Sequence, residues 1–159
     1  MAVALAAALS AMAARLSAKH LADASKLAKR ADSLRSEAAP LARTDAVAYG
    51  RVLAAQRTGE GDVVHDALSR AADIPVAVAE AGVEVAEISA YLARDGNPNL
   101  KGDAITAALL AEAGVRAATR LAKINLSGVG IEDGRMRNVA PSERENQHRP
   151  EPPAPPEEA

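Results

Sequence analysis

A short polar loop leads into an alanine-rich helix, and it holds the densest group of side chains that could bind a ligand. Asn97 and Asn99 carry amides, and Asp103 carries a carboxylate at the helix entrance. We expect Asp103 to be the N-cap residue, beside free backbone N–H groups and the positive end of the helix dipole. Such a junction can bind a polar or anionic ligand, although an Asp here can also serve only as a cap. Local sequence leaves both interpretations open.

The same loop has the residues of a chain reversal. Gly96 and the asparagines tolerate left-handed backbone conformations, which are common where a helix ends. Pro98 disfavours the helical conformation of Asn97, the residue before it. We therefore expect one helix to stop at Gly96 and the next to run from about Ala104.

Four other polar residues lie in apolar surroundings. Asp45 precedes three apolar residues in mid-helix, where a lone carboxylate is unfavourable unless it binds something or pairs with a base such as Arg43. Arg15 and Lys19 are four residues apart on the first predicted helix, so they either clamp a carboxylate from one face or reach into solvent. Asn125 closes the last predicted helix, and since asparagine is a poor helix former we expect its amide to have a use.

The composition excludes several function classes. The chain of 159 residues has no cysteine, which rules out disulfides and thiolate chemistry and fits a cytoplasmic protein. A net charge of −2 and the absence of Phe and Trp argue against nucleic-acid binding. The three histidines are far apart, so we expect no metal site. The apolar first residues are too few to cross a bilayer, and no basic residue precedes them, so neither a membrane nor secretion is expected.

The apolar residues recur at helical rather than strand spacing, so we predict an all-α protein folded as an up-and-down helical bundle. Helices are expected over residues 2–19, 22–56, 63–72, 75–94 and 104–126. The second is either one long helix or two that meet near Pro40, because an interior proline removes a backbone hydrogen bond. A turn is expected at Thr58–Gly61. We expect Asp62 to cap the third helix and Pro75 to open the fourth.

The last part of the chain has a different composition. Residues 127–159 contain six of the nine prolines and few apolar side chains. Such a segment cannot bury enough surface to offset the entropy lost on ordering. We therefore predict one helical domain over residues 1–126 and a disordered, proline-rich tail over residues 127–159.

The helical domain has a core of small side chains. Apolar residues make up 48% of the chain, yet Phe and Trp are absent, so each buried side chain removes little area from water. The first predicted helix is apolar on nearly every side, and a small bundle would leave part of that surface exposed. We therefore expect a homodimer that forms through helix faces, with the first helix at or beside the contact.

Several segments together resemble the cyclodeaminase/cyclohydrolase family, which includes formiminotetrahydrofolate cyclodeaminase and methenyltetrahydrofolate cyclohydrolase. The resemblance covers roughly residues 2–126, and the spacing of the segments is more specific than any single motif. The segments are Ala11–Lys19, Asp45–Tyr49, Ala71–Val76, Gly96–Asn99 with Asp103–Ala104, and Ile124–Leu126. The resemblance implies a helical domain that acts on a tetrahydrofolate derivative and holds no permanently bound cofactor.

The resemblance also implies roles for the candidate residues. An amidine carbon that is attacked by water or loses ammonia needs a carboxylate to move a proton and offset the positive charge. Asp103 and Asp45 are therefore the expected catalytic residues. The pterin offers a polar edge to amides and the glutamate tail attracts cations. The expected substrate-binding residues are Asn97, Asn99, Arg15, Lys19 and Asn125.

Two departures from the family pattern leave the activity open. Family members usually begin with a Pro- and Gly-rich loop, whereas this sequence starts within the first helix, so either the true start lies upstream or the loop is lacking. An Asn that is common in the family, four residues before Asn125, is Leu121 here. Cyclohydrolase and cyclodeaminase activity fit the sequence alike. The alternative to an enzyme is a non-catalytic helical oligomer that retains the fold.

Overall fold

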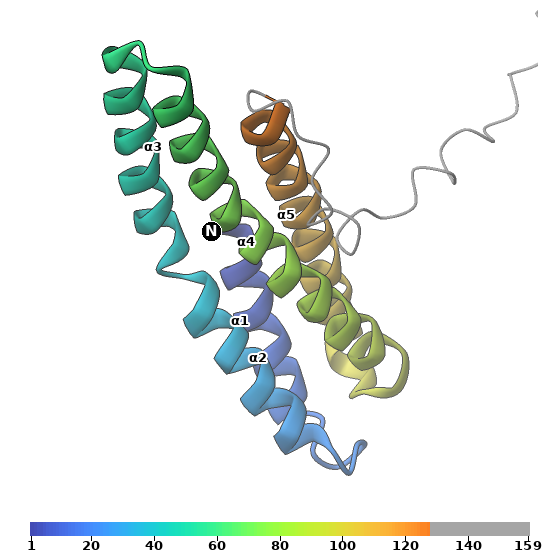
Figure 1. Ribbon diagram of the computed structural model, residues 1–159. Coiled ribbons are helices and arrows are strands. Elements are labelled where there is room, and N and C mark those ends of the chain that lie inside the picture. Colours follow the sequence, from blue (N-terminus) through green and yellow to red (C-terminus); the bar gives the residue numbers. More distant parts are fainter. Residues whose placement is uncertain (128–159) are drawn as a thin grey trace, which may run out of the picture.

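A computed structural model describes residues 1–127, and within that range the protein is entirely helical (Figure 1). The all-α bundle predicted from the sequence is thus confirmed. The predicted tail lies outside the described residues except for Ser127, which ends the last helix. The elements are α1 (Ala2–Arg15), α2 (Ala24–Ala38), α3 (Leu41–Thr58), α4 (Gly61–Asp95), the short 3-10 helix η1 (Pro98–Leu100) and α5 (Lys101–Ser127).

Helix α1 lies at the centre of the lower half of the bundle, where it packs against α2, α4 and α5. Seven of its residues are buried, and five of these are alanines. At the start of α1, Val3 is so close to α4 and α5 that a Cβ at Gly82 would lie 3.2 Å from its side chain and one at Gly114 only 2.6 Å. Small residues therefore let the three helices approach closely. Helix α1 stops at Arg15, four residues before its predicted end, and continues as turns to His20.

A buried pair of serines joins α1 to α4. The Ser10 and Ser89 hydroxyl oxygens are 2.7 Å apart, and both side chains are fully buried. Each hydroxyl also lies within hydrogen-bonding distance of the carbonyl four residues before it in its own helix, Ala6 for Ser10 and Val85 for Ser89. The pair thus satisfies its own polar groups in an otherwise apolar core.

The two interior prolines behave differently. At Pro40 the chain divides into α2 and α3, one of the two outcomes predicted. At Pro75 the prediction was wrong, because α4 runs without a break through the proline for 35 residues. An interior proline costs about 3 kcal/mol, but Pro75 is buried and α4 packs along α5 and α1, which outweighs this local cost. Asp62 accordingly lies in the first turn of α4 and is not its cap, which is Glu60.

The connections predicted on either side of α4 are confirmed. Gly59 has a φ of 73°, which favours glycine, and turns the chain between α3 and α4. Helix α4 ends at Asp95, and Gly96 is its C-cap. Asn97 is extended, with φ −65° and ψ 118°, as expected for a residue before proline. Because η1 fills the gap that follows, α5 begins three residues earlier than predicted, at Lys101.

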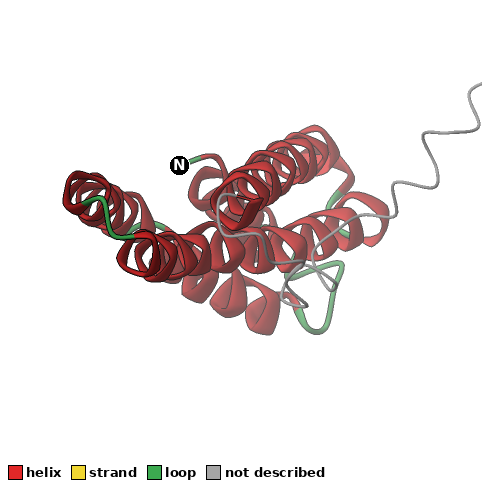
Figure 2. Ribbon diagram, turned by 45° about the horizontal axis from the view of Figure 1, so that its top comes forward, coloured by secondary structure: helices red, strands yellow, loops and turns green. Residues whose placement is uncertain are grey.

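Helix α3 lies at the outer edge of the molecule, beside the first half of α4 (Figures 1 and 2). Its main contact is with α4, and it touches α2 only near the junction at Pro40. Only Val52 and Ala55 are buried among its 18 residues. The lower half of the bundle is therefore a packed four-helix unit, and α3 with the first half of α4 forms a less covered hairpin. None of the helices described is long and apolar enough to span a bilayer.

Candidate functional site

The predicted ligand loop is held by hydrogen bonds to the end of α1. The Asn97 backbone N–H donates to the Ser17 hydroxyl at 2.9 Å, and its side-chain amide donates to the Leu16 carbonyl at 3.1 Å. The Asn97 side-chain oxygen accepts from the Asn99 N–H at 3.0 Å. Both ends of the Asn97 amide are thus used inside the protein. Asn97 therefore acts here as a clasp between the loop and the turn after α1.

Ser17 is a part of this clasp that sequence reasoning missed. Its side chain is 1% exposed, and its hydroxyl donates to the Ala13 carbonyl at 2.8 Å while accepting from Asn97. Gly96 packs closely against it, since a Cβ there would lie 3.0 Å from the Ser17 oxygen and 2.4 Å from the Leu92 carbonyl oxygen. With φ at −77°, Gly96 is not left-handed, so that expectation was wrong. Close packing explains the glycine.

Asp103 is not the N-cap that the sequence predicted. It is the third residue of α5 and lies in the first turn, because η1 leads straight into the helix at Lys101. Its carboxylate remains near the positive end of the helix dipole, which favours a negative charge. The Asp103 and Asn99 side chains make no hydrogen bond within residues 1–127.

The predicted pair of basic residues does not share a helix face. Arg15 is the last residue of α1 and forms an ion pair with Asp32 on α2. Lys19 lies in the turn that follows, so the (i, i+4) relation of a helix does not apply to it. The shared face was therefore a wrong prediction, caused by the early end of α1. Both side chains remain exposed near the loop of Asn97.

Asp45 lies in a different environment, at the rim of an apolar pocket above the start of α1. The pocket has a volume of about 270 Å³ and lies between α1, α3, α4 and α5. Asp45 supplies the only ionisable side chain among the described residues that line it, and it makes no hydrogen bond or ion pair with another residue of the range 1–127. The lining residues include Met1, Val3, Leu41, Asp45, Ile74, Pro75, Val78, Gly114 and Leu121.

Two more residues face the same space by their position on a helix. Asn125 follows Leu121 by four residues, which places it one turn further along the same face of α5, and it is half-buried. Tyr49 follows Asp45 in the same way on α3, and 62% of it is exposed. Two of the residues predicted from sequence, Asp45 and Asn125, therefore flank one pocket from two helices.

The two predicted catalytic carboxylates do not meet within one chain. At a rise of about 1.5 Å per residue, Asp103 lies about 27 Å along α5 from Leu121, which lines the pocket of Asp45. In Figure 1 the loop before α5 is at the lower end of the bundle, and the start of α1 is near its middle. Asn97, Asn99, Asp103, Arg15 and Lys19 thus gather at one end, and Asp45 and Asn125 lie towards the other.

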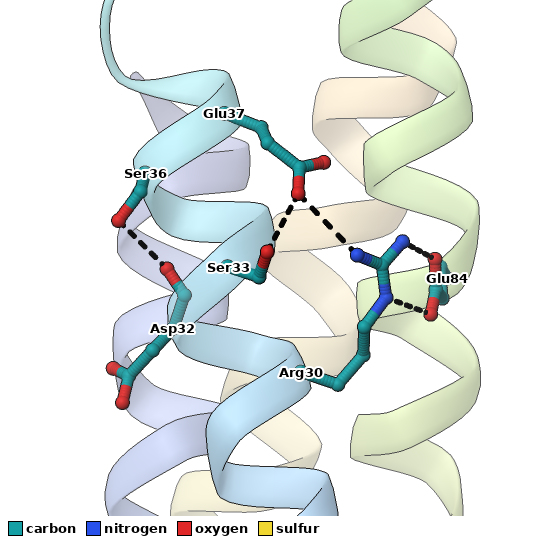
Figure 3. Close-up of polar contacts among 6 residues, drawn as sticks. All are labelled: Arg30, Asp32, Ser33, Ser36, Glu37 and Glu84. Carbon is teal, nitrogen blue, oxygen red and sulfur yellow. Dashed lines mark hydrogen bonds and ion pairs between the residues drawn. The ribbon is translucent and has the colours of Figure 1, made fainter.

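A third polar group joins α2 to α4 through a charge network (Figure 3). Arg30 donates two hydrogen bonds to the Glu84 carboxylate, at 2.6 and 2.5 Å, and one to Glu37 at 3.3 Å. The Ser33 hydroxyl donates to the same Glu37 oxygen at 2.7 Å. The hydrogen bonds from Arg30 lower the pKa of Glu84, and those to Glu84 raise the pKa of Arg30. These side chains are saturated by each other, so we assign them a structural role.

No cluster of three or more His, Cys, Asp or Glu side chains in the described part of the chain could hold a metal ion. The pocket of Asp45 therefore offers a carboxylate, a neighbouring amide and apolar walls. This set can bind a flat, mostly apolar ring and move a proton at its edge.

Comparisons with known proteins agree with the resemblance seen in the sequence. The family model described as formiminotransferase-cyclodeaminase matches residues 1–144. A solved structure, formiminotetrahydrofolate cyclodeaminase from Thermotoga maritima, superposes with a TM-score of 0.76 at 28% sequence identity. The match covers 86% of this chain and 71% of that protein. A search of curated proteins found no match.

Proposed function

The chain belongs to the formiminotransferase-cyclodeaminase family, and from this premise we propose that it is a folate one-carbon enzyme whose reaction takes place beside Asp45. The observation that carries the proposal is the carboxylate of Asp45 at the rim of an apolar pocket, with no protein partner within the described range. The pocket volume of about 270 Å³ is near the lower end of ligand pockets, which is about 300 Å³. It suits one ring system, with the rest of the folate outside.

In this proposal Asp45 acts as a general base and as a counter-charge. A ring-closing nitrogen attacks the amidine carbon, the bond from that carbon to nitrogen breaks, and ammonia leaves. Asp45 accepts the proton that the attacking nitrogen loses, and its charge offsets the cation that forms. The Asn125 amide is available to orient the polar edge of the ring. In hydrolysis of the cyclic product, Asp45 would accept a proton from the attacking water instead.

We propose cyclodeamination as the first activity to test, because that is the reaction in the name of the similar solved protein. Cyclohydrolase activity is the second candidate, since water addition uses the same carbon and the same carboxylate. The substrate is a free tetrahydrofolate derivative in the cytoplasm, with no resident cofactor.

The competing function is a helical oligomer without catalysis. One observation favours it: Leu121 presents an apolar side chain to the pocket at the position where the family commonly has Asn. Binding without turnover would then be expected. Calorimetry with tetrahydrofolate and 5-formiminotetrahydrofolate, run beside an assay for ammonia and for the cyclic product, separates the two functions. Product formation supports the enzyme, and folate binding without product supports the alternative.

Asp103 stays an untested prediction from the sequence. Its distance from the pocket along α5 makes it a suitable matched variant for Asp45, because both are Asp on exposed parts of helices. A homodimer also remains a prediction. The apolar surface of α1 that suggested it is largely buried inside the chain, so another surface has to carry the contact.

A further inference from the structure

One face of the α3–α4 hairpin carries a long groove. It has a volume of about 610 Å³ and runs along the seam between the two helices, opposite in helical angle to Asp45 on α3. Its walls are mostly small or apolar: Val47, Ala48, Ala54, Ala55, Val63, Ala67, Ala71 and Ile74. Its polar lining consists of Thr44, Arg51, Thr58, Asp66 and Arg70.

The groove residues recur at the spacing of a helix–helix seam. On α3 they fall at Thr44, Val47, Arg51, Ala54 and Thr58, alternating steps of three and four residues. This heptad spacing faces another helix when helices pack side by side. Within residues 1–127 no third helix covers the groove, and Val47 and Val63 are 54% and 41% exposed. The pattern therefore predicts packing against helices that this chain does not supply within that range.

The charges on the two walls differ in sign. Arg51, on α3, has no ion pair within the described residues. Asp66, on α4, is bound by Arg70 at 2.9 Å, and a carboxylate can accept further hydrogen bonds on the remaining lone pairs of its two oxygens. A helix pair that placed an acidic wall over Arg51 and a basic wall over Asp66 would match both. The same hairpin, turned over, has those two walls.

We propose that the groove is the contact with a second copy of this chain, formed by the hairpins of two copies. The two-fold axis runs parallel to the helices, so that α3 of each copy packs on α4 of the other and the four helices form a bundle. Arg51 then pairs with the partner's Asp66, twice by symmetry. A two-fold axis perpendicular to the helices would place α3 on α3, with like charges facing, which is unfavourable.

The first test measures oligomeric state by sedimentation velocity of the full chain between 1 and 100 μM. The protein is expected to be a dimer. Val47→Glu puts a charge into the groove at an exposed position, and should raise the dimer dissociation constant at least tenfold while circular dichroism stays unchanged. The matched control is Leu109→Glu, at a position of α5 that is 60% exposed, and it should leave the dimer intact. A monomer over this range, or a dimer insensitive to Val47→Glu, would overturn the proposal.

A second test uses the absence of cysteine in the chain. Arg51→Cys and Asp66→Cys proteins with tags of different size are mixed and oxidised. The proposal expects a disulfide between the two tagged chains, and little between Arg51→Cys and Leu109→Cys. Equal yields from both mixtures, or none from the first, would contradict the geometry even if the protein is a dimer. Because this readout needs no folate, its failure is separate from failure of the proposed function.

Discussion

The two ends of this helical bundle hold polar side chains in opposite circumstances. At the loop before α5, Asn97 and Ser17 are bound to the backbone of neighbouring elements, so their polarity builds the structure. At the pocket above α1, Asp45 projects from an apolar lining and binds no other residue of the range 1–127. A dense polar group in a sequence can thus be a structural clasp, whereas a single carboxylate among apolar residues is the better candidate for chemistry.

The largest effect is expected at Asp45. Asp45→Asn keeps the size of the side chain but removes the base and the charge, so turnover should fall roughly ten- to a thousand-fold. Stability should hardly change, because Asp45 is exposed. Initial rates of ammonia release and a thermal melt measure both. If the folded variant keeps full turnover, the pocket of Asp45 is not the active site.

The next largest effect tests the clasp. Ser17→Ala leaves the Asn97 N–H without its acceptor in a buried position, which should lower the free energy of unfolding by about 1–3 kcal/mol. Urea denaturation measures it, with Ser36→Ala as the control, since Ser36 makes a similar bond to a carbonyl but is exposed. We expect less than about 0.5 kcal/mol from the control. Equal effects in the two variants would mean that the clasp adds nothing to stability.

A smaller and pH-dependent effect is expected at the charge network between α2 and α4. Hydrogen bonds from Arg30 lower the pKa of Glu84, so this pair stabilises the fold above the unfolded pKa of about 4.5 and loses that contribution as the pH falls below it. The pair is partly exposed, so Glu84→Gln should cost at most about 1 kcal/mol at pH 7.

Denaturation of Glu84→Gln at pH 7 and at pH 3 checks this sign. The difference from the unaltered protein should shrink at the lower pH. Glu80→Gln is the control, because Glu80 lines the same groove without an ion pair within the described residues. A difference that grew towards pH 3 would contradict the assignment.

The smallest effect is expected at Asp103, if the comparison of the two ends is right. Asp103→Asn removes a charge from the first turn of α5, worth about 0.3–1 kcal/mol through the helix dipole. Folate affinity and turnover should stay within about twofold. A loss of turnover as large as that of Asp45→Asn would restore Asp103 to the active site, and would require the loop of one chain to reach the pocket of another.

The positions of the prolines and glycines decided how much of the fold was predictable. Gly59 and Pro40 act locally, through a left-handed turn and a missing N–H, and the sequence predicted their effect. Pro75 has the same local chemistry as Pro40, yet α4 continues through it because both sides of the helix are packed. Local rules cannot weigh that packing, so the break predicted at Pro75 was wrong.

The candidate site was predictable in part for the same reason. Asp45 and Asn125 are unusual for their local surroundings, and this alone marked them. Their closeness to one pocket depends on how α3 and α5 cross α4, and no local pattern contains that information. Ser17 gave no signal, because a serine at the end of an alanine-rich helix is ordinary until a loop 80 residues away binds it.

By itself the sequence determined the helical class, the family and the residues with unusual chemistry, because periodicity, turn residues and burial preferences act over a few neighbouring positions. Only the tertiary structure decided which of those residues share a site. It placed Asp45 and Asn125 beside one pocket and bound Asn97 into a clasp. It also left one face of the α3–α4 hairpin uncovered. Those outcomes depend on contacts between distant segments, whose free energies exceed the local preferences that the sequence reveals.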